Sequence, residues 1–573
     1  MRILFILFIC LGTLLPAQAA PKQEIRASWI TTLGGLDWPS QKATSPAGIE
    51  RQKKELCNIL DKLQEANFNT VLFQTRLRGD VIYPSALECF AESLTGHTGQ
   101  NPGYDPLKFA IEECHRRGME IHAWMVAIPI GNKRQVGLQG KQSVVRKHPE
   151  LCKQFRGSWY LDPGNPGTAG YLSLMVREIV ANYDIDGIHL DYIRYPEQGE
   201  DFPDKDTYRK YGHKQEKSQW RRDNITRIVR QVYTEVKKLK PWVKVSSSPV
   251  GKYRDTYRYP SKGWNAYHAV YQDAQKWLKE GIHDAIFPMM YFLGNQFYPF
   301  ALDWQENKNE RWVIPGLGIY FMHPKEQNWK LDEIVRQLYF LRDIHTDGQA
   351  YFRNRFLMDN TKGLMDELEK NFYLYPAVVP PMTWADSIAP SVPTLPSLIP
   401  GERQVRMSWH ASTDNNPGGI YYRIYASDQY PVNTERAENL ICTRTDSTSY
   451  LFTPLLPWHQ RTYWAVTAVD RFGNESQPLA LNIPDSAGIQ TITLQNLHAD
   501  HFGRNRTGSA PDSSSYTGNA ATAGKRTFPL QHPDSRRTNQ TGRHGSSEPT
   551  ACGIKIHFAP SSYEKKSYFC KDN

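Results

Sequence analysis

Short apolar segments and longer amphipathic segments alternate along the chain from residue 25 to residue 352. The short segments are rich in β-branched, aromatic and apolar residues, which is typical of buried strands, and the longer ones repeat their apolar residues at helical spacing. Eight strands are predicted, over residues 25–30, 68–76, 120–125, 186–191, 243–248, 284–291, 312–320 and 347–352. Six helices are predicted between them, over residues 47–66, 106–117, 168–183, 218–239, 271–280 and 331–344.

This order of elements predicts an α/β fold, a (β/α)8 TIM barrel over residues 21–375. Pro and Ser breaks in the fifth and seventh strands leave the strand count open by one. The loops after the second, third and fourth strands are long, and long loops on the C-terminal face of a barrel usually build its site. The competing fold is an open doubly wound sheet, but the sequence has no glycine-rich phosphate loop to support a nucleotide site.

The composition changes in residues 376–396, where six prolines predict a stiff linker. Short segments of alternating apolar and polar residues follow, such as 405–409 and 463–469, with turn residues between them. This pattern predicts a β-sandwich over residues 397–485, of a kind that mostly serves as a spacer or a binding platform. Residues 496–573 are rich in Ser, Thr, Gly, Asn, Arg and His and are predicted to form a disordered tail.

The first twenty residues have the pattern of a secretory signal peptide. Arg2 is followed by an apolar run over residues 3–15 and then by small residues up to Ala20. We therefore expect an exported protein that is periplasmic or associated with the cell envelope. No later segment is long and apolar enough to anchor the chain, so no integral membrane segment is expected after signal removal.

Charge and cysteine content exclude two further classes of protein. The formal net charge is +10, or +9 without Arg2, but the Lys and Arg residues are spread along the helices instead of forming one block. Nucleic acid is therefore not expected as a partner. Seven of the eight cysteines follow the signal segment and are scattered, so neither a disulfide framework nor a zinc site is predicted. The expected chemistry needs no metal and no other cofactor.

The fourth predicted strand leads directly into a cluster of polar and aromatic residues at 186–196. Side chains alternate along a strand, so Gly187, His189 and Asp191 share one face. A barrel presents its chemistry at the C-terminal ends of its strands, and a carboxylate buried there without a function is costly. Asp191 is therefore the first candidate catalytic residue. The alternative is that Asp191 caps the next segment or pairs with Arg194.

Several motifs in the predicted barrel resemble those of one family. The most specific is 186–196, and it is accompanied by segments 79–88, 94–96, 102–107, 122–124, 161–164 and 220–224. Together they resemble the bacterial glycosyl-hydrolase-like family ten, whose members are exported barrel proteins that often carry a C-terminal fibronectin-like domain. The resemblance covers residues 22–375, and the sandwich segment 468–476 resembles a fibronectin type III module.

The resemblance implies hydrolysis of O-glycosidic bonds in a polysaccharide. For some members of the family the substrate is the glycan strand of peptidoglycan, notably strands stripped of their stem peptides. The chain departs from the family pattern at two places. Residues 89–91 are Cys-Phe-Ala where Pro-Trp-Ser is usual, and Met289 stands where Gln is usual. These departures concern contacts with the outer parts of the substrate more than the chemistry.

Glycoside hydrolysis usually needs two carboxyl groups, one ionised and one able to donate a proton. We predict that Asp191 is the nucleophile or the base. Glu88, on the loop after the second strand, is predicted to be the general acid, because apolar neighbours raise the pKa of a carboxyl group. The alternative for Glu88 is a solvated loop acid. Asp80, Asp105 and Asp162 adjoin Gly or Pro and are expected to stabilise turns.

Eight further residues are predicted to contact the substrate: Arg76, Trp124, His189, Tyr192, Arg194, Tyr195, Asn224 and Tyr291. Arginine and asparagine can bind sugar hydroxyls, a nearby arginine also favours an ionised aspartate, and aromatic rings at strand ends can stack on pyranose faces. The alternatives are a surface ion pair for Arg194, a hydrogen-bonded core residue for His189 and simple packing for Asn224.

The sequence thus predicts an exported glycoside hydrolase whose partner is a polysaccharide. A glycosidase for dietary or host polysaccharide is one alternative. The other is a glycan-binding protein of the cell surface whose barrel has lost activity, and an intact pair of carboxyl groups favours the enzyme over it. The stereochemistry stays open, because a separation of roughly 5 Å between the two carboxyl groups gives retention and a wider one gives inversion.

Overall fold

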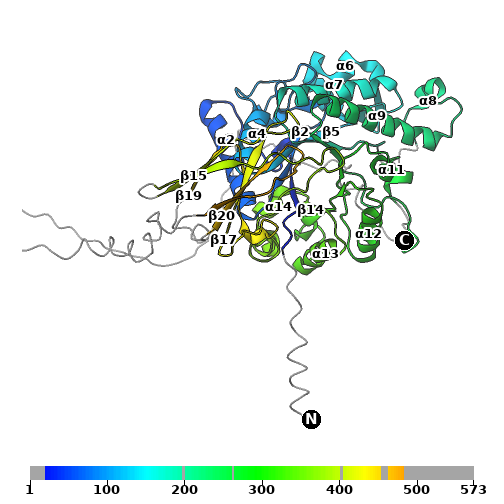
Figure 1. Cartoon of the computed structure of the whole chain (residues 1–573). Helices are drawn as coiled ribbons and strands as arrows, with labels where there is room; N and C mark the ends of the chain where they lie inside the picture. Colours follow the sequence, from blue (N-terminus) through cyan, green and yellow to red (C-terminus); the bar gives the residue numbers. More distant parts are fainter. Residues whose placement is uncertain (1–19, 197–200, 261–263, 401–403, 453–462, 483–573) are drawn as a thin grey trace, which may run out of the picture. The chain divides into compact units, whose positions relative to one another are not determined.

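The computed structural model describes residues 20–196, 201–260, 264–400, 404–452 and 463–482 (Figure 1). Except for Ala20, the predicted signal segment lies outside these residues, and so does the predicted tail. Both stay predictions. In the part of the chain that the structure describes, no helix has the length and apolar character needed to cross a membrane.

Eight parallel strands form a barrel, as predicted. Their bounds are β1 (Ile25–Ile30), β2 (Thr70–Arg76), β5 (Glu120–Val126), β9 (Gly187–Asp191), β10 (Lys244–Ser247), β11 (Ala285–Ile286), β12 and β13 (Trp312–Val313 and Gly316–Leu317) and β14 (Gly348–Tyr351). The strands pair in the order β14–β1–β2–β5–β9–β10–β11–β12. Nearly all of their residues are buried, because elements cover both faces of a parallel sheet.

Residues 312–317 act as the seventh strand and close the barrel. β12 pairs with β11 on one side, and β13 pairs with β14 on the other. Pro315 lies between the two pieces and has no N–H group for the ladder, which explains why the predicted strand is interrupted. The predicted sixth strand is shortened in the same way. Pro288 comes shortly after β11, and beyond it Met289 forms only isolated bridges, to Val250 and to Gly316.

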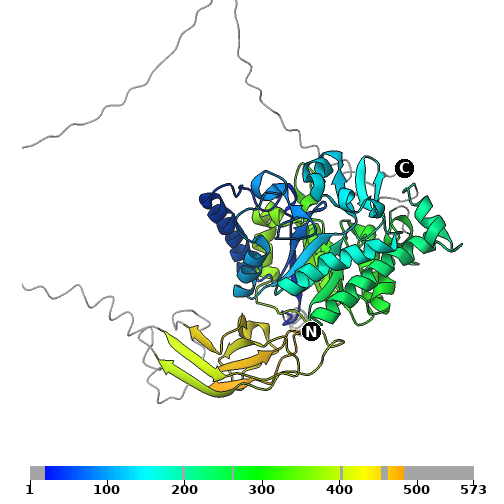
Figure 2. The ribbon, with the colours of Figure 1, turned by 90° about the horizontal axis from the view of Figure 1, so that it is seen from above.

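The six predicted helices are present with small shifts at their ends: α2 (Pro46–Glu65), α4 (Pro106–Arg116), α7 (Pro166–Asn182), α9 (Lys217–Leu239), α11 (Ala274–Lys279) and α13 (Leu331–Asp343). They surround the barrel strands (Figure 2). In α2 the apolar stripe Leu56, Ile59, Leu60 and Leu63 is buried, as its spacing requires. Shorter helices occupy the loops: α3 (Glu92–Thr95), α5 (Lys133–Gln139), α6 (Val144–Lys147), α8 (Lys205–Tyr211), α10 (Ala266–Ala269), α12 (Tyr298–Glu306), α14 (Asn354–Met358) and α15 (Leu364–Glu367).

Two of the long loops contain strands of their own, which the sequence pattern did not reveal. The loop after β5 carries a small antiparallel sheet in the order β6–β8–β7, formed by Pro129–Asn132, Ser158–Leu161 and Cys152–Phe155. The loop after β2 carries β3 (Asp80–Val81) and β4 (Cys89–Phe90), which pair with each other in parallel. Both loops therefore have fixed backbones near the C-terminal ends of the barrel strands.

A β-sandwich follows the barrel, as predicted. One sheet has the order β15–β16–β19, formed by Thr394–Pro400, Val405–His410 and Ser449–Phe452. The other has the order β18–β17–β20–β21, formed by Leu440–Thr445, Tyr421–Ser427, Tyr463–Val469 and Leu479–Asn482. The first strand begins inside the predicted linker 376–396. The two sheets share a core that includes Trp409, Ile424 and Trp464. The assignment of this sandwich to the fibronectin type III class stays a prediction.

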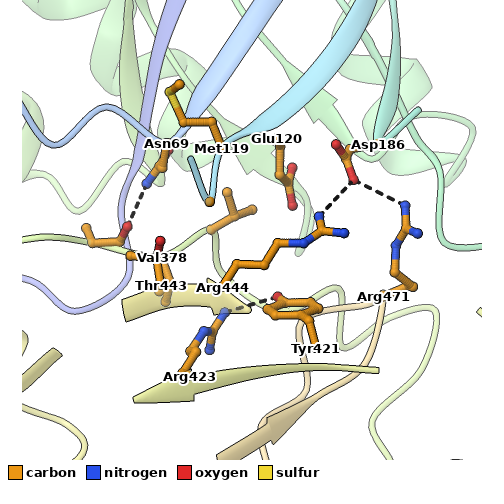
Figure 3. Close-up of a pocket in the computed structure, with 13 residues that line it drawn as sticks. Asn69, Met119, Glu120, Asp186, Val378, Tyr421, Arg423, Thr443, Arg444 and Arg471 are labelled. Carbon is orange, nitrogen blue, oxygen red and sulfur yellow. Dashed lines mark hydrogen bonds and ion pairs between the residues drawn. The ribbon is translucent and has the colours of Figure 1, made fainter. Parts of the chain in front are cut away.

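The barrel and the sandwich are joined by apolar contacts and by ion pairs. Met382 and Phe472 belong to the same buried cluster as residues of the barrel strands. Figure 3 shows Arg444 and Arg471 of the sandwich beside Asp186, at the start of β9, with distances to a carboxylate oxygen of 4.0 and 3.2 Å. His115 contacts the other oxygen at 2.7 Å. Burial alone would raise the pKa of Asp186, but His115 and the two arginines outweigh it and hold this pKa well below its usual value.

We predict that Arg471→Ala lowers the free energy of unfolding at pH 7 by about 3 kcal/mol, because it leaves the Asp186 charge buried with fewer partners. Denaturant titration measures this loss. The contribution of Asp186 is present above the pKa of an unfolded aspartate, so the difference from wild type should shrink as the pH falls below about 4. The control is Arg436→Ala, which breaks the exposed pair with Glu438 and should cost under about 1 kcal/mol. Equal losses in the two variants would contradict the interpretation.

Candidate active site

Asp191 lies at the C-terminal end of β9, between two strands that both supply hydrogen-bond donors. Trp124 of β5 donates from its indole nitrogen to Oδ2 at 3.0 Å. Ser248, directly after β10, donates its hydroxyl to Oδ1 at 2.8 Å, and the backbone N–H of Tyr192 donates to the same oxygen at 2.7 Å. Asp191 is 6% exposed. The strand register therefore fixes the position of this carboxyl group from both sides.

Two opposing effects act on the charge of Asp191. Burial raises the pKa of Asp191 above its usual value, and the Ser248 hydroxyl, the charge of Arg194, the Tyr192 N–H and the Trp124 indole offset only part of this rise. The three hydrogen bonds all end on carboxylate oxygens, which is the arrangement that an ionised carboxyl group requires. The contacts suit the predicted role of nucleophile or base.

Tyr192 and Arg194 follow Asp191 and lie beside it. Tyr192 has a φ of 49° and is half-buried, so the chain turns sharply directly after the carboxylate. The guanidinium group of Arg194 lies over the ring of Tyr192 at 4.6 Å and over the ring of Trp264 at 4.8 Å. Arg194 is 5% exposed, yet no described residue accepts a hydrogen bond from its Nε or Nη1. Two buried donor nitrogens beside Asp191 thus lack a hydrogen-bond acceptor among the described residues.

Glu88, the predicted general acid, is not the solvated loop acid that was the alternative. It is buried and forms a two-pronged ion pair with Arg76, in which Nε and Nη2 donate to its two oxygens at 2.8 and 2.6 Å. The Tyr171 hydroxyl lies 2.9 Å from one of these oxygens. Arg76 also donates to the backbone carbonyls of Val126 and Ala127, at the end of β5. The pair fastens the β2 loop to the barrel, and both oxygens of Glu88 already accept hydrogen bonds, so the geometry does not support the predicted role of general acid.

Sequence reasoning placed Asp80 only in a turn, although this residue shares the β2 loop with Glu88. The carbonyl of Asp80 does close a tight turn, accepting the N–H of Leu77 at 2.9 Å. Its side chain accepts the N–H of Arg78 at 2.9 Å and is half-buried. Burial raises its pKa to about 7, and the charge of Glu88 adds to the rise. The only sequence feature that could have pointed to a raised pKa at Asp80 is that Gly79 and a second acid, Glu88, lie in the same loop.

His189 lies inside the barrel, where it has no exposed surface. Its Nε2 lies 3.3 Å from the indole nitrogen of Trp29, and its Nδ1 lies 3.0 Å from the hydroxyl of Ser246. Burial and neighbouring histidines hold the pKa of His189 well below its usual value, so the ring is neutral. The contacts fit the alternative, a hydrogen-bonded core residue, because an enclosed side chain cannot reach a substrate.

Three more predicted contact residues are buried and packed against other side chains. Tyr195 and Asn224 are both buried, and the amide of Asn224 donates to the Tyr195 hydroxyl at 3.4 Å. Tyr195 also packs edge-on against Phe202 and Tyr271. Tyr291 is buried and stacks on Phe352 with an interplanar angle of 22°. The structure therefore brings together Asp191, Trp124, Tyr192 and Arg194, with the pair of Arg76 and Glu88 on the adjacent loop.

The described residues contain no group of three or more His, Cys, Asp or Glu side chains arranged to hold a metal ion. The five cysteines that the structure describes, at positions 57, 89, 114, 152 and 442, are free.

A carboxylate at the end of the fourth strand of a parallel barrel, beside an indole, a tyrosine and an arginine, fits a site of the glycoside hydrolase class. Comparison with known proteins agrees with this class. The model of the family "Glycosyl hydrolase-like 10" matches residues 24–326, more than half of the chain. The protein belongs to this family and is a glycoside hydrolase, which confirms the resemblance in the barrel motifs.

Two relatives show how far the similarity extends. The glycosyl hydrolase YngK of Bacillus subtilis (strain 168) is 32% identical over 485 residues, which cover 80% of this chain and 93% of YngK. The glycosyl hydrolase DigH of Escherichia coli (strain K12) is 33% identical over 289 residues, which cover 47% of this chain and 66% of DigH.

Solved structures are more distant. The glycoside hydrolase domain of PgaB (BpsB) from Bordetella bronchiseptica has a TM-score of 0.42 at 15% identity and covers 61% of this chain and 98% of that domain. The catalytic domain of β-amylase from Paenibacillus polymyxa has a TM-score of 0.43 at 10% identity and covers 62% of this chain and 99% of that domain.

We predict that Glu88→Gln lowers the free energy of unfolding by about 3 kcal/mol, because it leaves the Arg76 charge buried without its partner. Denaturant titration, in parallel with an activity assay, measures the effect. The control is Glu92→Gln, on the same loop as Glu88. It removes a half-exposed acid that pairs with Arg134 and should cost under about 1 kcal/mol. A Glu88→Gln variant that is inactive but as stable as wild type would instead support the role of general acid.

Proposed function

We propose that the protein hydrolyses the glycan strands of peptidoglycan outside the cytoplasm, with Asp191 as the carboxylate at the reacting carbon. The observation that carries the proposal is the position of Asp191, held at the end of β9 by donors from β5 and β10. Family membership supports the reaction class. The resemblance in the barrel motifs and the predicted signal segment support the substrate and the location.

The unpaired donors of Arg194 favour this substrate over a neutral polysaccharide. A buried guanidinium group with two unpaired donor nitrogens is costly until a ligand accepts from it, and a carboxylate is its best-matched acceptor. In peptidoglycan the muramic acid ring carries a lactyl carboxylate once the stem peptide has been removed. A neutral dietary glucan offers only hydroxyl groups at the same place. Tyr192 and Trp264 hold the guanidinium plane in position.

We expect Asp191→Asn to reduce the release of saccharides from amidase-treated sacculi by at least about 100-fold, because amide cannot act as nucleophile or base. Chromatography of the soluble saccharides measures the release, and thermal unfolding checks that the variant is folded. The control is Asp206→Asn, which changes an exposed acid of α8. Unchanged release by Asp191→Asn would refute the assignment. If the wild type binds the strands but releases nothing, the glycan-binding alternative gains support.

We expect Arg194→Met to raise KM by about 10- to 100-fold for strands with free lactyl carboxylates, the range of a charge-assisted hydrogen bond. For oligosaccharides of N-acetylglucosamine, which carry no carboxylate, the rise in KM should be small. Steady-state kinetics on the two substrates measure the difference, and Arg209→Met in α8 is the exposed control. An equal effect on both substrates would show that Arg194 acts through Asp191 and does not bind a carboxylate.

A further inference from the structure

Hydrolysis by Asp191 requires a second carboxyl group that holds a proton. Glu88 is committed to its ion pair. Asp37, on the loop after β1, is enclosed by two backbone N–H groups and by an ion pair with Arg353. Asp80 differs from both. It is half-buried, and of its two carboxyl oxygens only Oδ1 accepts a hydrogen bond from a described residue.

The local backbone fixes the direction of the Asp80 side chain. Gly79 adopts a φ of +66° in the tight turn before it, and a Cβ there would lie 2.9 Å from Ile130, so the turn depends on glycine. Asp80 then forms the first residue of β3, whose second residue, Val81, pairs with Arg76 and is fully buried. Successive side chains of a strand point to opposite faces, so Asp80 points away from that buried face.

The strand order brings the loop that carries Asp80 close to the loop that follows Asp191. β2, which leads into the Asp80 turn, and β9, which ends in Asp191, are separated by β5 alone. Two strand spacings put the backbones of β2 and β9 roughly 10 Å apart. Side chains that point toward each other across this distance can bring two carboxyl groups to the separation found in glycosidases. Arg78 of the same turn lies over the ring of Tyr192 at 5.5 Å, so the two loops are in contact.

The surroundings of Asp80 also suit a proton donor. Burial, with the nearby Glu88 charge, raises the pKa of Asp80 to about 7. At neutral pH the Asp80 carboxyl group is therefore protonated in a large share of the protein molecules. Asp191 instead accepts three hydrogen bonds, as an ionised group does. Burial raises the pKa of both carboxyl groups, and they differ in their hydrogen bonds, three to Asp191 and one to the Asp80 side chain. A glycosidase separates its acid from its nucleophile or base by such differences in surroundings.

We propose that Asp80 is the catalytic acid of this enzyme, a role that rests on the proposed function. Protonated Asp80 gives its proton to the glycosidic oxygen as the bond from that oxygen to C1 breaks, and the bonding electron pair stays on the oxygen. If Asp191 is the nucleophile, its oxygen bonds to C1, and water then displaces it while returning a proton to Asp80. If Asp191 is the base, it takes a proton from the water that attacks C1. Either route consumes one water per bond broken.

The test is Asp80→Asn, which retains an oxygen for the Arg78 N–H. With amidase-treated strands the variant should lose at least about 100-fold in kcat/KM. With a dinitrophenyl glycoside of the released saccharide, whose leaving group needs no proton, the loss should stay below about 10-fold. Because the protonated form acts, wild-type kcat/KM on the strands should fall as the pH rises through about 7, and the variant should lack this limb.

The matched control is Glu92→Gln on the same loop, which should behave as wild type on both substrates. Equal losses of Asp80→Asn on the strands and on the dinitrophenyl glycoside would overturn the inference, and so would wild-type activity or an unchanged pH profile. In each case the proposed function stands if the wild type releases saccharides and Asp191→Asn does not. A wild type that cleaves neither substrate would overturn both proposals.

Discussion

The register between neighbouring parallel strands is the constraint on which the site depends. Asp191 pairs with Val126 of β5, and Leu190 pairs with Ser247 of β10. The ladder therefore sets Trp124 and Ser248 at fixed positions around one buried carboxylate. Burying a charged group in the barrel interior is costly unless hydrogen-bond donors surround it. Here the donors need no rearrangement, because the hydrogen bonds between the barrel strands already hold them in place. The closure through residues 312–317 leaves no free strand edge from which this register could slip.

Buried carboxylates at the two ends of the barrel meet this cost in different ways. At the N-terminal end of the barrel, Asp186 forms ion pairs with His115 and the arginines of the sandwich. At the C-terminal end of the barrel, Glu88 on the loop after β2 forms an ion pair with Arg76. Both contacts join separate parts of the fold. Asp191 instead receives neutral donors, with the charge of Arg194 nearby. Neutral donors stabilise a carboxylate without occupying it as an ion pair does, so its charge remains available to a substrate.

Much of the barrel could be predicted from the sequence, because each strand and helix has its own local pattern. The strands shortened at Pro288 and Pro315 were the exception, since long-range pairing decides which residues around a proline still join the ladder. Asp191 could also be found, because it ends an apolar strand. The surroundings of Glu88 could not, since they depend on Arg76 reaching across the loop, and no spacing along the chain encodes that contact.

The sequence by itself determined the order of the elements, the strand that carries Asp191 and the family motifs, all of which depend on residues close together along the chain. Only the tertiary structure decided that Glu88 is paired, that Arg194 keeps two unpaired donor nitrogens and that His189 is enclosed. Glu88 and Asp80 lie eight positions apart in one loop, yet one is neutralised by an arginine and the other is half-buried without one. Their difference arises because charge and burial are set by how the loop folds back on Arg76 at the end of β2 and packs against Tyr171 of α7.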